Sequence, residues 1–303
     1  MSANNYKNVV LLGATGTVGK YVLPELLADP SFNVTVLSRT DSKAVFASNV
    51  NVVKIDYSDT AALTKALTNQ DVVISTVGGE GTSSNFGEIL VNAAIDAKVK
   101  WIIPSEFGID YEDPSANIPV LGSKLAVVNL LKKNQSRIAY TFITTAAFLD
   151  WGFDNGFLGF DIKNRAVTLY DEGKNLTAGT SLPTIGKAVV ATLHHPELTQ
   201  NKRIYVADAV FTQKQALELF EKYTKAKWTV KNITSVNARK EAEENLAKGN
   251  IGPAFVGFIL SYAYGGSGGG TFESKALNKA LGIPTVPLDQ LVKEAVERAN
   301  AAN

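Results

Sequence analysis

The sequence predicts an α/β fold, a doubly wound parallel sheet accompanied by a smaller, mainly helical substrate lobe. Short apolar runs rich in Val and Ile alternate with amphipathic stretches through the first half, as buried parallel strands and their crossover helices do. The 303 residues, 45% of them hydrophobic, can bury a sizeable core. Lys and Arg (30) nearly balance Asp and Glu (29), which argues against a nucleic-acid partner, because such proteins carry a basic face.

The first half contains five predicted strands, each a short run of buried-type residues. They lie at residues 9–12, 34–37, 52–55, 72–77 and 101–103. Helical patterns follow these strands at residues 18–27, 60–67, 86–97 and 121–131. Consecutive parallel strands joined by helices imply right-handed crossovers.

Beyond a sixth strand segment near residue 142 the alternation loosens. Further strands are predicted at residues 166–170 and 203–206, and helices at residues 185–193, 213–223, 236–248, 254–264, 274–281 and 288–299. We therefore expect a nucleotide-binding domain at residues 1–150, to which segments at about 183–210 return. Residues 151–303 are expected to form mainly the substrate-binding lobe.

The rarest residue types exclude several kinds of chemistry. The chain has no cysteine, so it has no disulfide and no thiolate nucleophile, and its two adjacent histidines exclude a His-rich metal site. No metal is expected. The apolar runs are too short for a signal peptide or a membrane span. We expect a cytoplasmic protein without a membrane partner, and the sequence leaves its oligomeric state open.

Glycines in the pattern G-x-x-G-x-x-G directly follow the first strand and open a helix. This context predicts a Rossmann-type dinucleotide site. Gly13 permits a tight turn, Gly16 lets the backbone approach a pyrophosphate, and Gly19 allows helix and strand to pack closely. The helix N-terminus favours that anion. The expected cofactor-binding residues of this loop are Gly13, Thr15, Gly16, Thr17, Val18 and Gly19.

The end of the second strand distinguishes between the two dinucleotides. An NAD site usually has an acid there, about 20 residues beyond the glycines, whereas Arg39 occupies that place here. An arginine would pair with the 2′-phosphate of NADPH, and Lys43 is near enough to help. The competing Asp41 lies past the strand end, where we expect it to cap a following helix. NADPH is therefore the predicted cofactor.

Four segments together resemble the isoflavone reductase-like group, within the NmrA-like branch of atypical short-chain dehydrogenases. They are residues 13–19, Ser38-Arg39, the fourth-strand end at residues 75–79, and Trp101-Ile102-Ile103-Pro104-Ser105-Glu106-Phe107-Gly108. The group includes phenylcoumaran benzylic ether and pinoresinol reductases. At the ends of the later strands, further cofactor contacts are expected from Thr76, Val77, Gly78, Ser105 and Phe148.

The resemblance also implies a catalytic lysine at the start of the helix after Pro-Ser-Glu-Phe-Gly, the place of Lys124. A partly desolvated lysine beside a cofactor can exchange protons near neutrality, although a surface lysine is the alternative. The group usually has an arginine one turn further on, where this chain has Val128. The Tyr-x-x-x-Lys spacings at Tyr170 and Tyr223 lie outside the nucleotide domain and are interpreted as coincidence.

The resemblance implies an NADPH-dependent reductase that transfers hydride to a small aromatic secondary metabolite, at a conjugated carbonyl or a quinone-methide-like electrophile. Two alternatives remain: a dinucleotide-binding redox sensor that acts through protein partners, and a non-redox isomerase or cyclase. Aromatic residues at 148–160 are candidates for an apolar substrate pocket or for ordinary core, and the glycine string at 265–270 is either a lid or a surface loop. Glu106 is expected only to hydrogen-bond locally.

Overall fold

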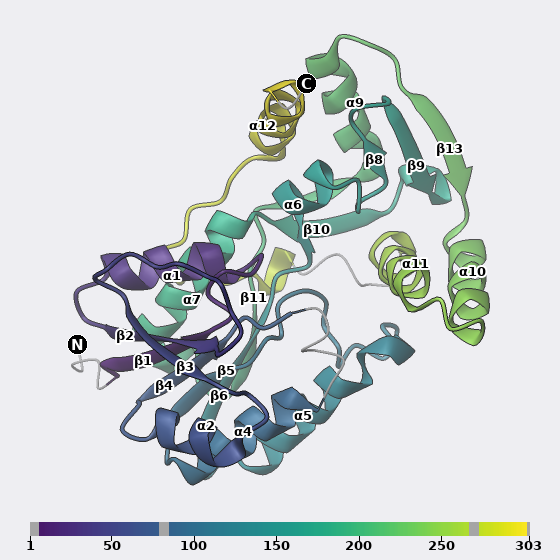
Figure 1. The fold of residues 1–303 in the computed structure, drawn as a ribbon. Coiled ribbons are helices and arrows are strands. Elements are labelled where there is room, and N and C mark those ends of the chain that lie inside the picture. The colour runs from purple at the N-terminus through teal and green to yellow at the C-terminus, as the bar shows by residue number, and fades with distance from the viewer. Residues whose placement is uncertain (1–5, 79–84, 267–272, 302–303) are drawn as a thin grey trace.

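The computed structural model describes residues 6–78, 85–266 and 273–301, and its larger part is a seven-stranded parallel sheet (Figure 1). The strands of this sheet are β1 (Asn8–Leu12), β2 (Asn33–Arg39), β3 (Asn51–Ile55), β4 (Val72–Ser75), β5 (Trp101–Ile103), β6 (Ala139–Thr144) and β11 (Lys202–Tyr205). Their order is β11-β6-β5-β4-β1-β2-β3. The predicted doubly wound α/β fold is confirmed.

Helices cover both faces of this sheet. Helices α1 (Gly19–Ala28) and α7 (Leu182–His194) cover one face, and α2 (Thr60–Leu67), α4 (Phe86–Asp96) and α5 (Gly122–Lys133) cover the other. The alternation along β1 explains why both faces are apolar: Val9 and Leu11 point into one core, whereas Val10 and Leu12 point into the other.

The direction of winding reverses between β1 and β4. The chain runs outward from β1 to β2 and β3, and then crosses back so that β4 pairs with the other side of β1. Ligands of open parallel sheets bind beyond the carboxyl ends of the strands at such a reversal. The loops after β1 and β4 are therefore neighbours at the expected ligand edge.

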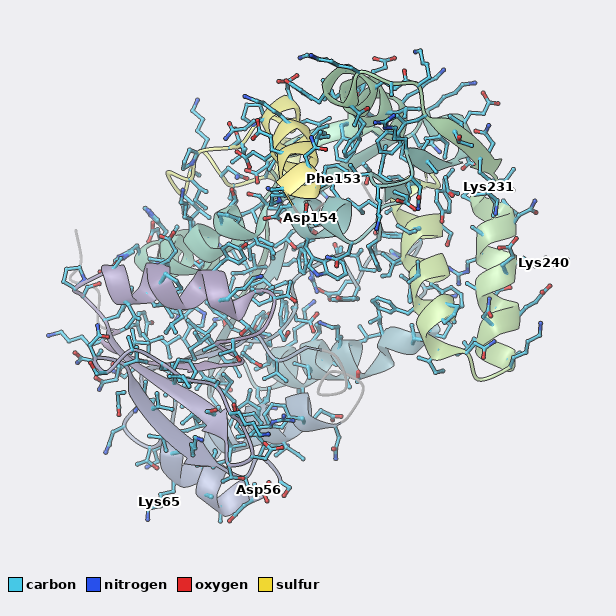
Figure 2. The ribbon with its side chains drawn as sticks, turned by 45° about the horizontal axis from the view of Figure 1, so that its top comes forward. Asp56, Lys65, Phe153, Asp154, Lys231 and Lys240 are labelled. Carbon is cyan, nitrogen blue, oxygen red and sulfur yellow. The ribbon has the colours of Figure 1, made fainter. Side chains whose placement is uncertain are left out.

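The smaller part contains two three-stranded sheets. One has β12 (Ala209–Thr212), β10 (Leu176–Thr180) and β7 (Ala147–Phe148), and the other has β13 (Thr229–Ile233), β9 (Ala166–Tyr170) and β8 (Phe160–Asp161). Around them lie α6 (Leu149–Asp154), α9 (Gln213–Thr224), α10 (Ser235–Ala247), α11 (Ile251–Tyr264) and α12 (Leu288–Ala301). Figure 2 shows Phe153 and Asp154 beside α12, where Asp154 binds Arg298 in a bidentate ion pair.

The remaining short elements are α8 (Pro196–Thr199) and the 3-10 turns η1 (Pro119–Leu121), η2 (Asp171–Gly173) and η3 (Glu273–Lys275). The predicted helix at residues 274–281 is wrong. Beyond η3 the chain runs beside β11: Ala276 forms a parallel bridge with Tyr205, and Leu277 N donates to the Tyr205 carbonyl at 2.8 Å. Pairing with a strand edge therefore overrides the helical pattern. No helix in the three described ranges is long and apolar enough to cross a membrane.

Candidate functional site

The glycine loop after β1 packs directly against the residue that follows β4. Gly13 has a φ of +78°, and a Cβ there would lie 2.8 Å from the carbonyl of Thr76. A Cβ on Gly19 would lie 2.1 Å from the Gly13 carbonyl oxygen, whereas one on Gly16 would lie 3.2 Å from it. Thr76 Oγ1 in turn donates to the Leu12 carbonyl at 2.8 Å. The turn and the close helix–strand packing thus require glycine.

The loop leads into the N-terminus of α1. Within the described part of the chain, no side chain caps this terminus, and the first turn of α1 carries no acidic residue. Thr15 and Thr17 are exposed, whereas Val18 is buried beneath the loop. An uncapped terminus presents backbone N–H groups and a partial positive charge, which suit a phosphate. These features fit a dinucleotide pyrophosphate.

Arg39 lies at the carboxyl end of β2, and its side chain is 65% exposed. The expectation that Asp41 caps a helix is wrong, because the described segment 40–50 contains no helix. Asp41 instead pairs with Arg39, with 3.2 Å between Arg39 Nε and Asp41 Oδ1. Lys43 is exposed two residues further on. Because both ionic groups face solvent, the pair can open for a phosphate.

The other residues expected to contact the cofactor lie at the same edge of the sheet. Val77 is half-buried and Gly78 is exposed just beyond β4. Ser105 follows β5, and half-buried Phe148 ends β7. Phe148 packs against the core that lies beneath α1 and α7. The strand order places the residues that follow β4 and β5 beside the reversal between β1 and β4, whereas Phe148 belongs to the small sheet of β12, β10 and β7.

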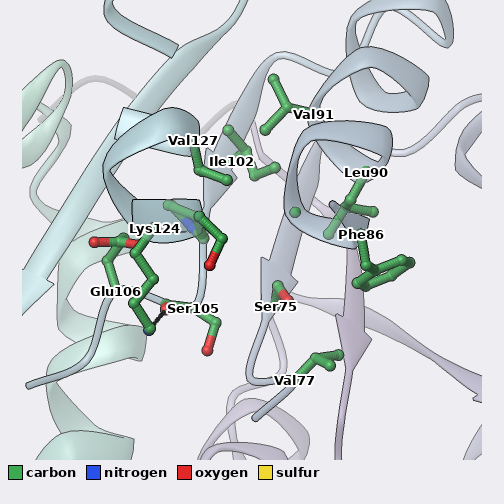
Figure 3. A pocket seen from close by; sticks show the side chains of 13 residues that line it. Ser75, Val77, Phe86, Leu90, Val91, Ile102, Ser105, Glu106, Lys124 and Val127 are labelled. Carbon is green, nitrogen blue, oxygen red and sulfur yellow. Dashed lines mark hydrogen bonds between the residues drawn. The ribbon is translucent and has the colours of Figure 1, made fainter. Parts of the chain in front are cut away.

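Lys124 lies in the first turn of α5 and reaches back to β5. Its Nζ donates to the Ser105 carbonyl (Figure 3). The same Nζ lies 5.3 Å from the ring centroid of Tyr111. Burial lowers the pKa of Lys124, and the nearby Glu106 carboxyl partly opposes this by raising it. A lysine with a lowered pKa can donate a proton more readily near neutral pH than an exposed one.

Glu106 is the residue whose importance the sequence did not indicate. Its side chain is 2% exposed, and burial raises its pKa to about 7, although Lys124 and Arg203 act in the opposite direction. Arg203 comes from β11 and binds Asp110 at 3.1 Å and Glu112 at 3.2 Å. Glu106 N makes a local hydrogen bond to the Pro104 carbonyl at 2.7 Å, whereas Glu106 Oε2 has no hydrogen-bond partner within the described residues.

A cavity of about 40 Å³ lies between the carboxyl ends of β4 and β5 and the starts of α4 and α5. Its polar lining includes Ser75, Ser105, Glu106 and Lys124, and apolar residues of α4, α5 and the ends of β4 and β5 form most of the remainder (Figure 3). The groups that can carry a proton thus lie together in a cavity whose other lining is largely apolar.

The aromatic residues at 148–160 divide between core and surface. Phe153 and Phe160 are fully buried in the smaller lobe, whereas Trp151 and Phe157 are half-buried and contact each other, with 5.2 Å between ring centroids. Phe157 also approaches Phe255 of α11, at 6.4 Å. Most of the glycine string at 265–270 lies outside the described residues.

Val128 and the two Tyr-x-x-x-Lys pairs lie away from this edge. Val128 is fully buried in the core beneath α5, so an arginine at this position would place a charged group where an apolar side chain now packs. Tyr170 ends β9 in the smaller lobe, and Tyr223 donates to Asp289 at 2.5 Å.

The fold and the loop after β1 define an α/β protein of the Rossmann type. The chain belongs to the NmrA-like family, whose model matches residues 5–251, as the motif resemblance predicted. Oxidoreductase aprR of Aspergillus flavus is 31% identical over 291 residues, which cover 94% of this chain and 97% of that protein. A phenylcoumaran benzylic ether reductase of Ginkgo biloba is 25% identical, over 65% of this chain and 68% of its own length.

Solved structures of related fold also match this chain over nearly its full length. AtPrR2 with NADP+ and (+)pinoresinol superposes with a TM-score of 0.79, covering 96% of this chain and 99% of that chain at 22% identity. The leucoanthocyanidin reductase of Vitis vinifera in complex with NADPH gives the same TM-score and coverage at 20% identity. These two likenesses support the same fold over 96% of the chain, a share that includes the smaller lobe.

Proposed function

We propose that the chain is an NADPH-dependent reductase that transfers hydride to a small aromatic metabolite, with Lys124 as the proton donor. The observation that carries this proposal is that Lys124 lies at the same sheet edge as the glycine loop, held against β5 by the Ser105 carbonyl. The relative aprR is named an oxidoreductase, and the structural neighbour AtPrR2 is bound to NADP+ and (+)pinoresinol.

The residues of the site divide the work of binding and chemistry. NADPH, when bound, supplies the hydride. The glycine loop and the N-terminus of α1 would hold the pyrophosphate, and Arg39 would bind the 2′-phosphate. The protonated Lys124 amine would give its proton to the substrate oxygen that gains negative charge as hydride adds to carbon. Half-buried Trp151, Phe157 and Phe255 support an aromatic substrate, because flat apolar rings stack on such side chains.

Turnover of aromatic enones, quinone-methide precursors and benzylic ethers tests the proposal, with NADPH absorbance and product followed together. Lys124→Ala should lower kcat by roughly 10²–10⁴-fold, the usual contribution of one acid–base group. Lys133→Ala, on the exposed end of the same helix, is the matched control and should leave kcat unchanged.

Three results would contradict the proposal in different ways. Conversion of substrate without consumption of NADPH would establish a non-redox isomerase or cyclase. Equal rates for wild type and Lys124→Ala would remove this lysine from the mechanism. Binding of NADPH without turnover of any compound, together with a cofactor-dependent protein complex, would establish a redox sensor.

A further inference from the structure

Glu106 carries a buried carboxyl group that the proposed hydride transfer does not itself use. It is almost completely shielded from solvent, and Oε2 has no hydrogen-bond partner among the residues that the structure describes. Buried polar atoms without partners are rare in folded proteins. A carboxyl kept in this state beside a candidate catalytic amine therefore requires an explanation other than packing.

The backbone after β5 presents Glu106 to the same amine that Ser105 binds. Glu106 N donates to the Pro104 carbonyl at 2.7 Å, which closes a tight turn directly after the strand. The turn offers the Ser105 carbonyl to Lys124 Nζ, and Glu106 lines the same cavity as Lys124 (Figure 3). Ser105 thus accepts a hydrogen bond from this amine, and the next residue, Glu106, adds a carboxyl group to the lining of the same cavity.

The charged groups around Glu106 come from three elements. Lys124 belongs to α5, Arg203 to β11, and Glu112 and Tyr111 to the segment between β5 and α5. Arg203 is held by other partners, since its Nε binds Asp110 and Glu112 and its Nη1 donates to Thr144 at 3.0 Å. Lys124 is the cation that shares the cavity with Glu106.

We propose that Glu106 is a positioning residue for Lys124: its buried carboxylate keeps the amine at the Ser105 carbonyl and favours the protonated form that donates the proton. The inference rests on the proposed function, because it assigns Glu106 a role in the same proton transfer. Glu106 touches neither substrate nor cofactor in this scheme, and it acts through Lys124 alone.

The electrostatics of the site explain why such a residue is needed. Burial disfavours the charged amine and lowers the pKa of Lys124, which reduces the share of the protonated amine that can donate a proton. The Glu106 carboxylate acts in the opposite direction and raises this pKa. Removing the negative charge while preserving the shape of the side chain should therefore make Lys124 lose its proton at lower pH.

The experiment measures the pH dependence of the reaction of Lys124 with a small acylating reagent, using mass spectrometry of the labelled peptides. It needs no substrate and uses the full chain. In Glu106→Gln the labelling midpoint of Lys124 should fall by on the order of one pH unit, within the range seen when a charged neighbour is lost. Asp96→Asn, which removes a surface carboxylate at the end of α4, should leave that midpoint unchanged. The exposed Lys133 is the internal reference.

An unchanged Lys124 midpoint in a folded Glu106→Gln variant would overturn the inference. If that variant does not fold, Glu106→Asp retains the charge but withdraws it by one methylene. Its midpoint should fall by a smaller amount, and the absence of any fall would equally overturn the inference. A shifted midpoint in a protein that reduces no compound would contradict the proposed reductase and not the coupling. Turnover with an unshifted midpoint would contradict the coupling of Glu106 to Lys124 and not the proposed reductase.

Discussion

Replacing Arg39 with alanine should weaken NADPH binding and leave NADH binding nearly unchanged. Its ion pair with Asp41 is exposed on both sides, at 65% and 70%, and such pairs contribute about 0–1 kcal/mol. Hydrogen bonds between charged groups, such as an arginine and a phosphate, contribute about 1.5–3 kcal/mol. The difference leaves about 1–2 kcal/mol for NADPH, which corresponds to a roughly 5–30-fold rise in Kd on removal of the guanidinium.

Isothermal titration of wild type and variants with both cofactors is the assay. Asp41→Asn frees Arg39 from its competitor, so it should hold or improve NADPH affinity, by at most about fivefold. Arg137→Ala is the control for loss of an exposed arginine, since Arg137 precedes β6 at the opposite edge of the sheet. The reasoning is refuted if Arg39→Ala binds NADPH as wild type does, or if wild type prefers NADH.

Two further predictions concern stability. Gly19→Ala should lower the free energy of unfolding by about 1–3 kcal/mol, because the new Cβ would lie 2.1 Å from a backbone oxygen. Gly252→Ala is the control: this glycine lies in the first turn of α11 with open space around it, so the substitution should be neutral or stabilising. Thermal melting compares the two variants with wild type. Burial raises the pKa of Glu106 from an ordinary 4.5 to about 7, so the folded state binds one more proton than the unfolded state between these pH values. The free energy of unfolding should therefore fall by up to about 3 kcal/mol as pH rises from about 4.5 to 7. Urea unfolding at several pH values measures this change.

The two stability predictions each have a clear contrary result. Equal melting temperatures for Gly19→Ala and wild type would mean that the loop does not pack on Thr76 as described. Glu106→Gln lacks the titrating group, so its stability should change less over this pH range. Parallel pH profiles for wild type and Glu106→Gln would show that Glu106 is not buried in the folded state.

The first half of the fold was predictable because its determinants are local. The predicted strand at residues 101–103 and helix at residues 60–67 match β5 and α2 residue for residue. Both faces of β1, β4 and β5 are buried, so the apolar runs of these strands are continuous and short. The glycine spacing was equally informative, since the turn and the close packing at Gly13 and Gly19 depend on neighbours within a few residues and on β4.

The smaller lobe was predicted less completely, because its strands depend on distant partners. Residues of β13 are mostly exposed, and its sequence Thr-Val-Lys-Asn-Ile pairs with β9 about sixty residues earlier. The strands β7 and β8 have two residues each, too few for a periodic pattern. The same limitation applies at residues 274–281, where the edge of β11 determines the conformation and the helical pattern does not.

The proton-bearing cluster escaped sequence reasoning for a related reason. Glu106 and Arg203 are almost one hundred residues apart, and they meet because β11 returns to pair with β6. Buried charges have no periodicity, and neither residue belongs to a motif whose chemistry is evident from spacing. Lys124 was found through the resemblance of the preceding pentapeptide to a family motif, whereas the partner that sets its charge required the tertiary structure.

The strand order separates the two tasks of the proposed site. Phosphate-binding groups follow β1 and β2, on one side of the reversal, whereas Ser105, Glu106 and Lys124 follow β5 on the other side. Arg39 ends β2 and Lys124 lies in α5, and the two side chains share no contact or charge interaction within the described residues. We therefore expect loss of Arg39 to change cofactor affinity and loss of Lys124 to change the chemical step. Substitutions at the ends of β1 and β2 should therefore change cofactor preference, and substitutions after β5 should change the proton chemistry, each without altering the other property.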